Sequence, residues 1–124
     1  MKKLLTILCV VLVASCSQEP EILTGPFVIR DGVKYDQKTN KPMEGITQKF
    51  YGNGQLYEQT HYKNGQRHGL DETFHENGQL KSQRNYKEGE WHGLVKAYNM
   101  YGQEIDGFPK CYQNDKKVGM SNCK

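Results

Sequence analysis

The sequence lacks two features that would settle its class at once: an apolar stretch long enough to cross a membrane, and a strong excess of one charge. Its longest apolar run extends only from Leu4 to Val13, whereas a helix needs about 20 residues to span a bilayer. The chain carries 17 Lys and Arg against 14 Asp and Glu, a balance that argues against nucleic acid as a partner. Its mean hydropathy of -0.84 leaves too few large apolar residues for a core between two layers.

The amino terminus has the pattern of an export signal. Lys2 and Lys3 precede the short apolar run, which predicts a signal peptide over residues 1–15. The run ends in "VASC" at residues 13–16, which resembles the bacterial lipobox. That resemblance implies cleavage before Cys16, a diacylglyceryl group on its sulfur, and a fatty acid such as palmitate on the new amino terminus. The alternative is an ordinary secretory signal followed by a chance cysteine.

Cleavage would remove Lys2 and Lys3, so the basic side chains that remain would exceed the acidic ones by only one. Such a nearly neutral surface lacks the cluster of basic residues that binds anionic lipid, whereas several acyl chains on Cys16 would anchor the protein firmly. The sequence therefore predicts a lipid-anchored protein of the cell envelope. Ser17, directly after the lipidated cysteine, favours the outer membrane over the inner one under the usual proteobacterial sorting rule.

Two cysteines remain once Cys9 leaves with the signal and Cys16 carries lipid. Cys111 and Cys123 would lie in an oxidising compartment, where a disulfide is the default state. The alternative is a metal-binding or redox-active pair. The long separation of the two cysteines and the absence of a nearby histidine in the sequence argue against it.

The sequence repeats itself. Gly45, Gly69 and Gly93 recur at a constant spacing, and they divide the sequence into units of about 45–68, 69–92 and 93–118. Each unit has turn signals, among them Asn-Gly, between short runs of alternating polar and apolar residues, which predicts a β-hairpin. The fold class is therefore all-β: an antiparallel meander of hairpin repeats, forming an elongated, twisted single sheet.

The register of this sheet can be predicted from its apolar residues. Because a slip of one residue sends every side chain to the other face, an extra residue at Gly69 is needed to bring the apolar positions of neighbouring strands together. This one-residue bulge places Thr60 opposite Leu70. With the same rule at Gly93, one face carries an apolar ladder that contains Phe50, Leu56, Phe74, Leu80 and Tyr98.

The predicted domain covers residues 27–124. Before it, residues 16–26 form a short acidic tether that begins with the lipidated cysteine. Residues 27–36 read as a hairpin around Asp31-Gly32 that caps one end of the sheet, because repeat arrays need protected ends. The Cys111–Cys123 disulfide would close the other end.

The repeated residues resemble a known pattern. "YKNGQRHG" at 62–69 and "YKEGEWHG" at 86–93 look like MORN repeats (membrane occupation and recognition nexus), and specifically like the bacterial variant. The resemblance implies a sheet that acts in binding, scaffolding or membrane association, with no catalytic residues common to the family. Many bacterial relatives carry the label of an antitoxin component of a toxin–antitoxin system.

Catalytic and metal-binding patterns are weak in this sequence. His61 and His68 would face each other across the Asn64-Gly65 turn, and they are weak candidates for a metal site because no third ligand is evident. Asp71 and Glu72 point to opposite faces of one strand and read as solvated charges. We therefore expect neither an enzyme nor a bound cofactor.

Binding is the remaining expectation. Tyr57, Arg67 and Trp91 are of the residue types that anchor interfaces, and Tyr57 and Trp91 are not accounted for by the apolar ladder. The alternative is that the aromatic residues only cover the sheet's own apolar stripe. The sequence predicts an envelope module that binds or scaffolds an envelope protein; the alternatives are a scaffold that binds lipid headgroups or glycan, and an immunity or antitoxin-type protein.

Overall fold

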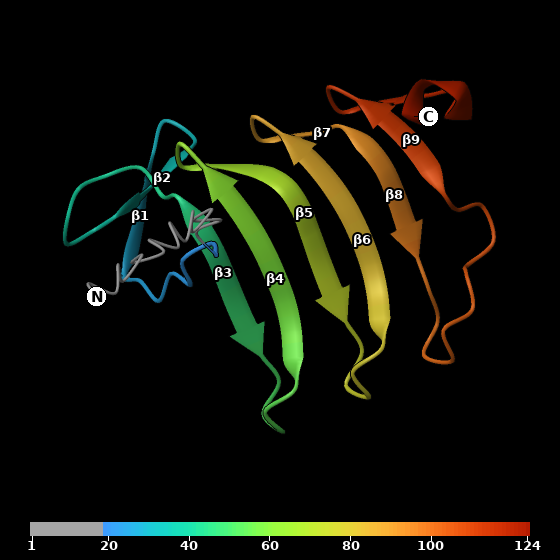
Figure 1. Ribbon diagram of the computed structural model, residues 1–124, viewed down its shortest axis with the longest axis horizontal. Helices are drawn as coiled ribbons and strands as arrows, with labels where there is room; N and C mark the ends of the chain where they lie inside the picture. The colour runs from blue at the N-terminus through green and yellow to red at the C-terminus, as the bar shows by residue number, and fades with distance from the viewer. Residues whose placement is uncertain (1–18) are drawn as a thin grey trace, which may run out of the picture.

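The computed structural model describes residues 19–124, and these form an all-β protein (Figure 1). The predicted signal peptide and the lipidation at Cys16 lie outside the described residues. The strands are β1 (Phe27–Arg30), β2 (Val33–Asp36), β3 (Gly45–Phe50), β4 (Leu56–Lys63), β5 (Gln66–Phe74), β6 (Leu80–Lys87), β7 (Glu90–Trp91), β8 (Gly93–Ala97), β9 (Lys110–Gln113) and β10 (Lys116–Val118), followed by a 3₁₀ turn at Met120–Cys123. Over this part of the chain, no helix has the length and apolarity needed to cross a membrane.

The predicted fold class is confirmed. Eight strands form one antiparallel sheet in the order β10-β9-β8-β6-β5-β4-β3, with β7 paired to β6, and the hairpin β1–β2 forms a separate small sheet. The tight turns have the residues that their backbone requires: φ is positive at Asn64 and Gly65, and again at Glu88 and Gly89. Such turns match the right-handed twist of the strands they join, so consecutive strands become neighbours.

The bulge at the repeated glycine is larger than the sequence analysis predicted. Tyr62 lies opposite Arg67, but Thr60 lies opposite Asp71, so a single residue of β4 faces three residues of β5. The predicted one-residue bulge, with Thr60 opposite Leu70, is wrong. Leu70 therefore lies on one face of the sheet, and Asp71 on the other.

The same enlarged bulge recurs one repeat later, where Tyr86 pairs with Trp91 while Ser82 pairs with Ala97. A side chain on the facing strand holds each bulge. His61 Nδ1 donates to the carbonyl oxygen of Leu70 at 2.8 Å. Asn85, at the equivalent position of the next repeat, donates to the carbonyl oxygen of Leu94 at 2.9 Å. Each bond satisfies a backbone group that the interrupted ladder leaves without a partner.

Glycine is required at the centre of both bulges. The φ angles of Gly69 and Gly93 are +91° and +112°, a region that side chains with a Cβ rarely adopt. The prediction that these two glycines hold the bulges is confirmed.

The apolar ladder is confirmed in part. Phe50 pairs with Leu56, and Phe74 with Leu80, each through a second register shift near the end of the strand. The other two predicted pairs, Leu56–Phe74 and Leu80–Tyr98, are not register partners within residues 19–124. They depended on the one-residue bulge.

The register defines two faces of the sheet, because paired residues lie on the same face and alternate along each strand. The Asp71 face carries the row Thr47, Thr60, Asp71 and Arg84, and the next row Lys49, Glu58, Thr73, Ser82 and Ala97. The Glu72 face carries Gln48, Gln59, Glu72, Gln83 and Lys96.

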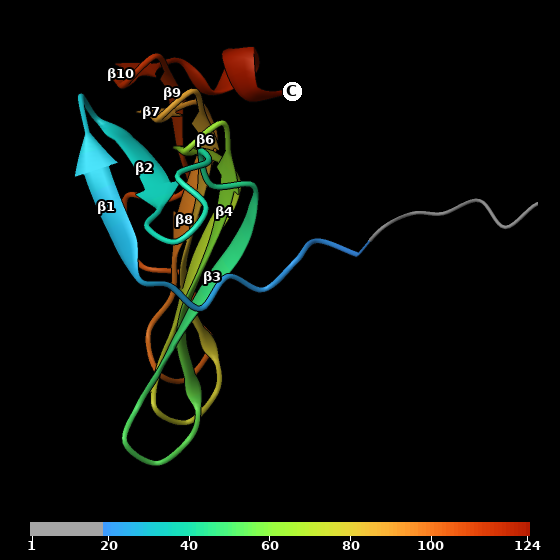
Figure 2. The same cartoon turned by 90° about the vertical axis from the view of Figure 1, so that its left-hand side faces the viewer.

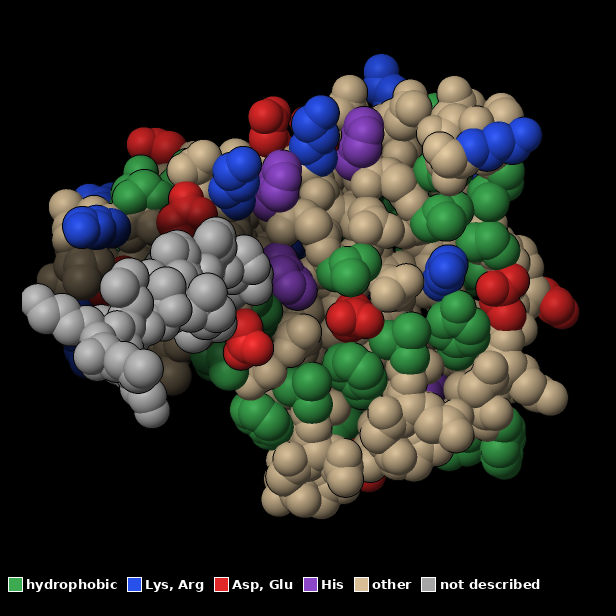
Figure 3. Space-filling view, in the orientation of Figure 1, with side chains coloured by type: hydrophobic (Ala, Val, Ile, Leu, Met, Phe, Trp, Pro, Cys, Tyr) green, Lys and Arg blue, Asp and Glu red, His purple; other side chains and the backbone are tan. Residues whose placement is uncertain are grey.

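The sheet is a single layer with a small buried core. Among the described residues, the buried apolar side chains are Met43, Ile46, Val95 and Cys111. The apolar pairs of the ladder belong to the Glu72 face and are only partly covered: Phe50 is 59% exposed, and Leu56, Phe74 and Leu80 are half-buried. Figure 3 shows apolar side chains gathered in a band across this face. The hairpin repeats therefore hold together mainly through neighbouring strands.

The two edges of the sheet differ: a chain segment covers β3, whereas the other edge is β10, a strand of only three residues. Residues 21–23, which the sequence analysis placed in the tether, run along β3: Leu23 N donates to Ile46 O at 2.7 Å, and Ile46 N donates to Glu21 O at 2.8 Å. At the other edge, β9 and β10 are joined to the 3₁₀ turn by the predicted disulfide between Cys111 and Cys123, whose Cα atoms are 5.9 Å apart. A covered edge and a very short edge strand both discourage pairing with other chains.

Candidate binding face

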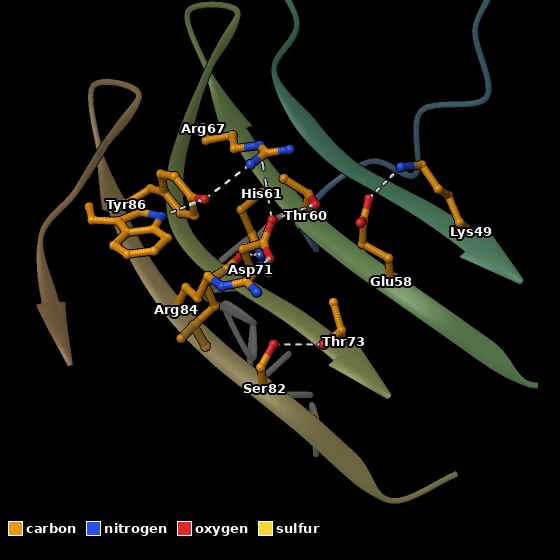
Figure 4. A network of polar contacts seen from close by, with 12 residues as sticks. Lys49, Glu58, Thr60, His61, Arg67, Asp71, Thr73, Ser82, Arg84 and Tyr86 are labelled. Atoms are coloured by element: carbon orange, nitrogen blue, oxygen red, sulfur yellow. Dashed lines mark hydrogen bonds and ion pairs between the residues drawn. The ribbon is translucent and has the colours of Figure 1, made fainter. Parts of the chain in front are cut away.

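Asp71 is the centre of a polar network on one face of the sheet (Figure 4). Its side chain is 2% exposed, and Thr60 Oγ1 donates to Asp71 Oδ2 at 3.0 Å. Arg84 Nη1 lies 3.5 Å from Oδ1, and Arg67 Nε lies 4.0 Å from Oδ2. A buried carboxylate needs such partners, and here one carboxylate holds two arginines whose guanidinium groups remain partly exposed.

The same face carries a row of aromatic side chains next to Arg67. Arg67 Nη1 donates to the Tyr86 hydroxyl at 3.0 Å, and Trp91 Nε1 donates to the same hydroxyl at 2.7 Å. The Trp91 ring meets Tyr112 edge to face, with centroids 4.8 Å apart. These contacts fix the orientation of an arginine and a tryptophan that occupy the same place in successive repeats.

The surroundings of Arg67 raise the pKa of its guanidinium and so favour the charged form. Burial alone would lower the pKa of its guanidinium, but hydrogen bonds with Tyr62 and Tyr86 and the nearby Asp71 carboxylate outweigh this and raise it. Lower on the face, Lys49 Nζ donates to Glu58 Oε1 at 2.7 Å, and this hydrogen bond raises the pKa of Lys49.

Three hollows lie on the Asp71 face, and together we call them the groove. The hairpin hollow, about 400 Å³, lies between β1–β2 and the sheet and includes Phe27 and Lys34 in its lining. The turn hollow, about 360 Å³, shares Lys34 and Arg67 with it. The loop hollow, about 640 Å³, is walled by Tyr57, Met100 and Ile105 over small floor residues, and it meets the hairpin hollow at Glu58.

Comparison with protein families matches residues 43–64 and 67–88 to the MORN repeat variant. Residues 43–88 therefore carry two MORN repeats of the variant type. Each match spans most or all of one hairpin, β3–β4 or β5–β6. No curated protein and no solved structure matches the chain.

The predicted repeat boundaries can be compared with these matches. The first two predicted units begin two residues later than the matched MORN repeats, and the third unit, 93–118, lies outside the matched segments. In the third unit β8 pairs with β9 after a long loop in place of a short turn. The bulge at Gly93 still belongs to the repeating geometry.

The structure brings two of the three predicted binding residues together. Arg67 and Trp91 both donate a hydrogen bond to the Tyr86 hydroxyl, close to the junction of the second MORN repeat with the third unit. Tyr57 lies in the loop hollow, with its ring edge-to-face against Tyr51 at a centroid distance of 5.1 Å. All three line or border the Asp71 face.

Asp71 itself was misread from the sequence. It is buried, not solvated, because the two extra residues of the bulge place it between Thr60 and Arg84 at the middle of the sheet. One signal was present in the sequence: the equivalent position of the next unit holds Val95, an apolar residue. In the structure, Val95 and the equivalent Thr47 of the preceding unit are both buried. A position that is interior in every MORN-like unit predicts an interior aspartate.

Local backbone contacts hold the two histidines that were candidates for a metal site, His61 and His68. His61 holds the first bulge through Leu70, and His68 Nδ1 accepts a 3.4 Å hydrogen bond from Glu88 N at the next turn. Both border one shallow hollow on the opposite side of the sheet from Asp71. Among residues 19–124, no group of three or more His, Cys, Asp and Glu is placed to hold a metal ion.

Proposed function

We propose that this protein is a lipid-anchored component of the cell envelope whose MORN-repeat sheet binds another protein through the Asp71 face. The observation that carries the proposal is the fixed set of Arg67, Arg84 and Trp91 beside a groove. Arginine and tryptophan dominate the energetics of many protein interfaces. Here they are already held by Asp71 and Tyr86, so binding would cost less side-chain entropy.

The predicted lipid anchor is consistent with the place where the chain joins the sheet. Glu21 is bonded to β3 and is close in sequence to the predicted lipidated Cys16. Five residues can reach at most about 17 Å when fully extended. An anchored protein would therefore hold its sheet close to the membrane surface, where envelope proteins are accessible.

Site-specific photocrosslinking in intact cells tests the binding proposal. The photoreactive amino acid p-benzoylphenylalanine replaces Tyr57 on one wall of the loop hollow, or Ile105 on the other wall. A matched control carries it at Lys96, which lies on the Glu72 face and lines none of the three hollows. We expect one and the same protein partner at positions 57 and 105, and not at position 96.

Two results would overturn the proposal. Capture of the same proteins at position 96 as at 57 and 105 would show that the Asp71 face has no selectivity. Adducts only with lipid at positions 57 and 105 would show that the face does not bind protein.

Metabolic labelling tests the anchor separately. Cells grown with alkynyl palmitate should label the wild-type protein, and the variant Cys16→Ala should lose the label. A wild-type protein without label would contradict the lipid anchor and leave the binding proposal intact.

A further inference from the structure

The charges of the chain are distributed unevenly over its surface. The groove is lined by five basic side chains, Lys34, Lys49, Arg67, Lys81 and Arg84, and by one acidic side chain, Glu58. Buried Asp71 adds one negative charge beneath them. The described residues as a whole carry only one more basic than acidic side chain. The groove is therefore positive, while the rest of the described chain has a net negative charge.

Part of this positive charge has no internal partner. Glu58 pairs with Lys49, and Asp71 is shared by Arg67 and Arg84. Within residues 19–124, Lys34 and Lys81 form no ion pair with a carboxylate. Lys34 Nζ is instead held 5.0 Å from the centre of the Tyr62 ring, which leaves its charge available to a ligand. The two unpaired lysines lie in different hollows, one near each end of the groove.

The shape of the groove restricts which kind of ligand can bind in it. The hairpin β1–β2 stands out from the sheet at one end (Figure 2), and residues of the 98–109 loop wall the other end. A flat bilayer cannot reach a floor that is bordered by raised elements on both sides. The five strands β3, β4, β5, β6 and β8 span about 19 Å at the usual strand spacing, which equals the length of about six extended residues.

The loop hollow adds an apolar requirement. Tyr57, Met100 and Ile105 are exposed on its walls, over a floor that includes Ser82 and Ala97. An apolar side chain of the ligand can be buried there, while carboxylates of the same ligand meet the basic residues.

We propose that the groove binds an extended, acidic segment of a partner protein, about six residues long, with an apolar side chain in the loop hollow. The inference rests on the proposed function and adds the chemical class of the partner. Acidic carboxylates would pair with Lys34 and Lys81, so binding weakens as ionic strength rises.

Selection from a phage-displayed random dodecapeptide library against the full-length protein in mild detergent tests this inference. We expect the selected peptides to be enriched in Asp and Glu with at least one large apolar residue. Their affinity, measured by fluorescence anisotropy with labelled synthetic copies, should fall about fivefold or more in the variant Lys34→Gln/Lys81→Gln. The control Lys63→Gln/Lys96→Gln removes the same charge from the Glu72 face and should bind as the wild type does.

Four results of the peptide experiment would overturn the inference: selection of neutral or basic peptides, no selected peptide at all, equal loss of affinity in the two double variants, or equal affinity in all three proteins.

Vesicles of phosphatidylglycerol and phosphatidylcholine test lipid as the alternative ligand. Binding to these vesicles that is lost only in Lys34→Gln/Lys81→Gln would assign the groove to a lipid headgroup. Self-association lost only in that variant, seen by analytical ultracentrifugation, would assign it to a second copy of the chain.

The two proposals can fail separately. A partner captured by photocrosslinking at Tyr57 and Ile105, together with peptides of no acidic character, would refute the acidic segment and leave the protein-binding function standing. Acidic peptides that bind in vitro without any protein adduct in cells would refute the function.

Discussion

At the scale of single residues, Asp71 has the largest influence on the candidate site. Its carboxylate accepts a hydrogen bond from Thr60 and lies within 4.0 Å of two arginines, one on its own strand and one on β6. Removing its charge would leave both guanidinium groups without their counterion in a partly buried place, and such loss of one partner costs more than the pair contributes. Asp71 therefore links the stability of the sheet to the orientation of the arginines on its surface.

The variant Asp71→Asn should lower the free energy of unfolding by about 1–3 kcal/mol, because the ion pairs are lost while the shape is kept. Urea denaturation at neutral pH measures the change. The control Glu72→Gln lies on the next residue but on the other face, half-buried beside Gln83, and we expect it to stay within about 0.5 kcal/mol of wild type. Equal effects of the two variants would contradict the role given to Asp71.

At the scale of elements, the hairpin and its bulge form the repeating unit. His61 and Asn85 are different residue types at equivalent positions, yet each donates a side-chain hydrogen bond to a leucine carbonyl within the bulge that it faces. The feature that recurs is therefore the hydrogen bond and not the imidazole. This gives His61 a structural role in the repeat.

Exchange of these two residue types tests that account. His61→Ala should cost about 1 kcal/mol of stability, because it leaves the Leu70 carbonyl without its donor, whereas His61→Asn should retain most of it. Thermal unfolding of both variants beside the wild type gives the comparison. An asparagine variant as unstable as the alanine variant would show that the imidazole itself is required.

The strap formed by residues 21–23 is a second element that can be tested. A Cβ on Gly45 would lie 2.4 Å from the Glu21 carbonyl oxygen, so Gly45→Ala should displace the strap from β3. We expect faster hydrogen exchange at the amides of Leu23 and Ile46. Gly54→Ala is the control: it also places alanine at a positive φ, +87° against +139° at Gly45, but its Cβ would meet nothing within 4 Å, so the strap amides should stay protected.

At the scale of the whole molecule, the protein is a one-dimensional array of strands closed at both ends. Each strand contacts mainly its neighbours, so stability is local to a large degree. The Glu72 face lacks a covering layer among the described residues, and the Asp71 face is bordered by the hairpin β1–β2 and the 98–109 loop. The groove exists because the two ends of the array carry elements that rise from the same face.

Reduction of the Cys111–Cys123 disulfide should therefore act on one end of the array. Opening a loop of this length removes about 3 kcal/mol in the loop-entropy model, and we expect faster hydrogen exchange in β9 and β10 but little change in β4 and β5. Hydrogen-exchange mass spectrometry with and without a reducing agent measures this. A uniform loss of protection over all strands would show that the array unfolds as a single unit.

Sequence alone was sufficient for the parts of this protein that depend on local chemistry. Turn residues with positive φ and two-residue alternation predict the strand and turn positions and the antiparallel meander. Contacts between adjacent strands account for the pairs Phe50–Leu56 and Phe74–Leu80 and for the cysteine pairing. The sequence also draws attention to Arg67 and Trp91, because side chains of different type occupy this one position in successive repeats.

Only the tertiary structure decided the size of the bulge, the burial of Asp71, the strap on β3 and the groove. The bulge has two extra residues because His61 and Asn85 must reach the carbonyls opposite them, a contact between strands that the spacing of glycines does not reveal. This single difference places Asp71, and not Leu70, on the face with Thr60 and Arg84. Register is a property of pairs of strands, so the set of side chains on each face depends on how neighbouring strands pair.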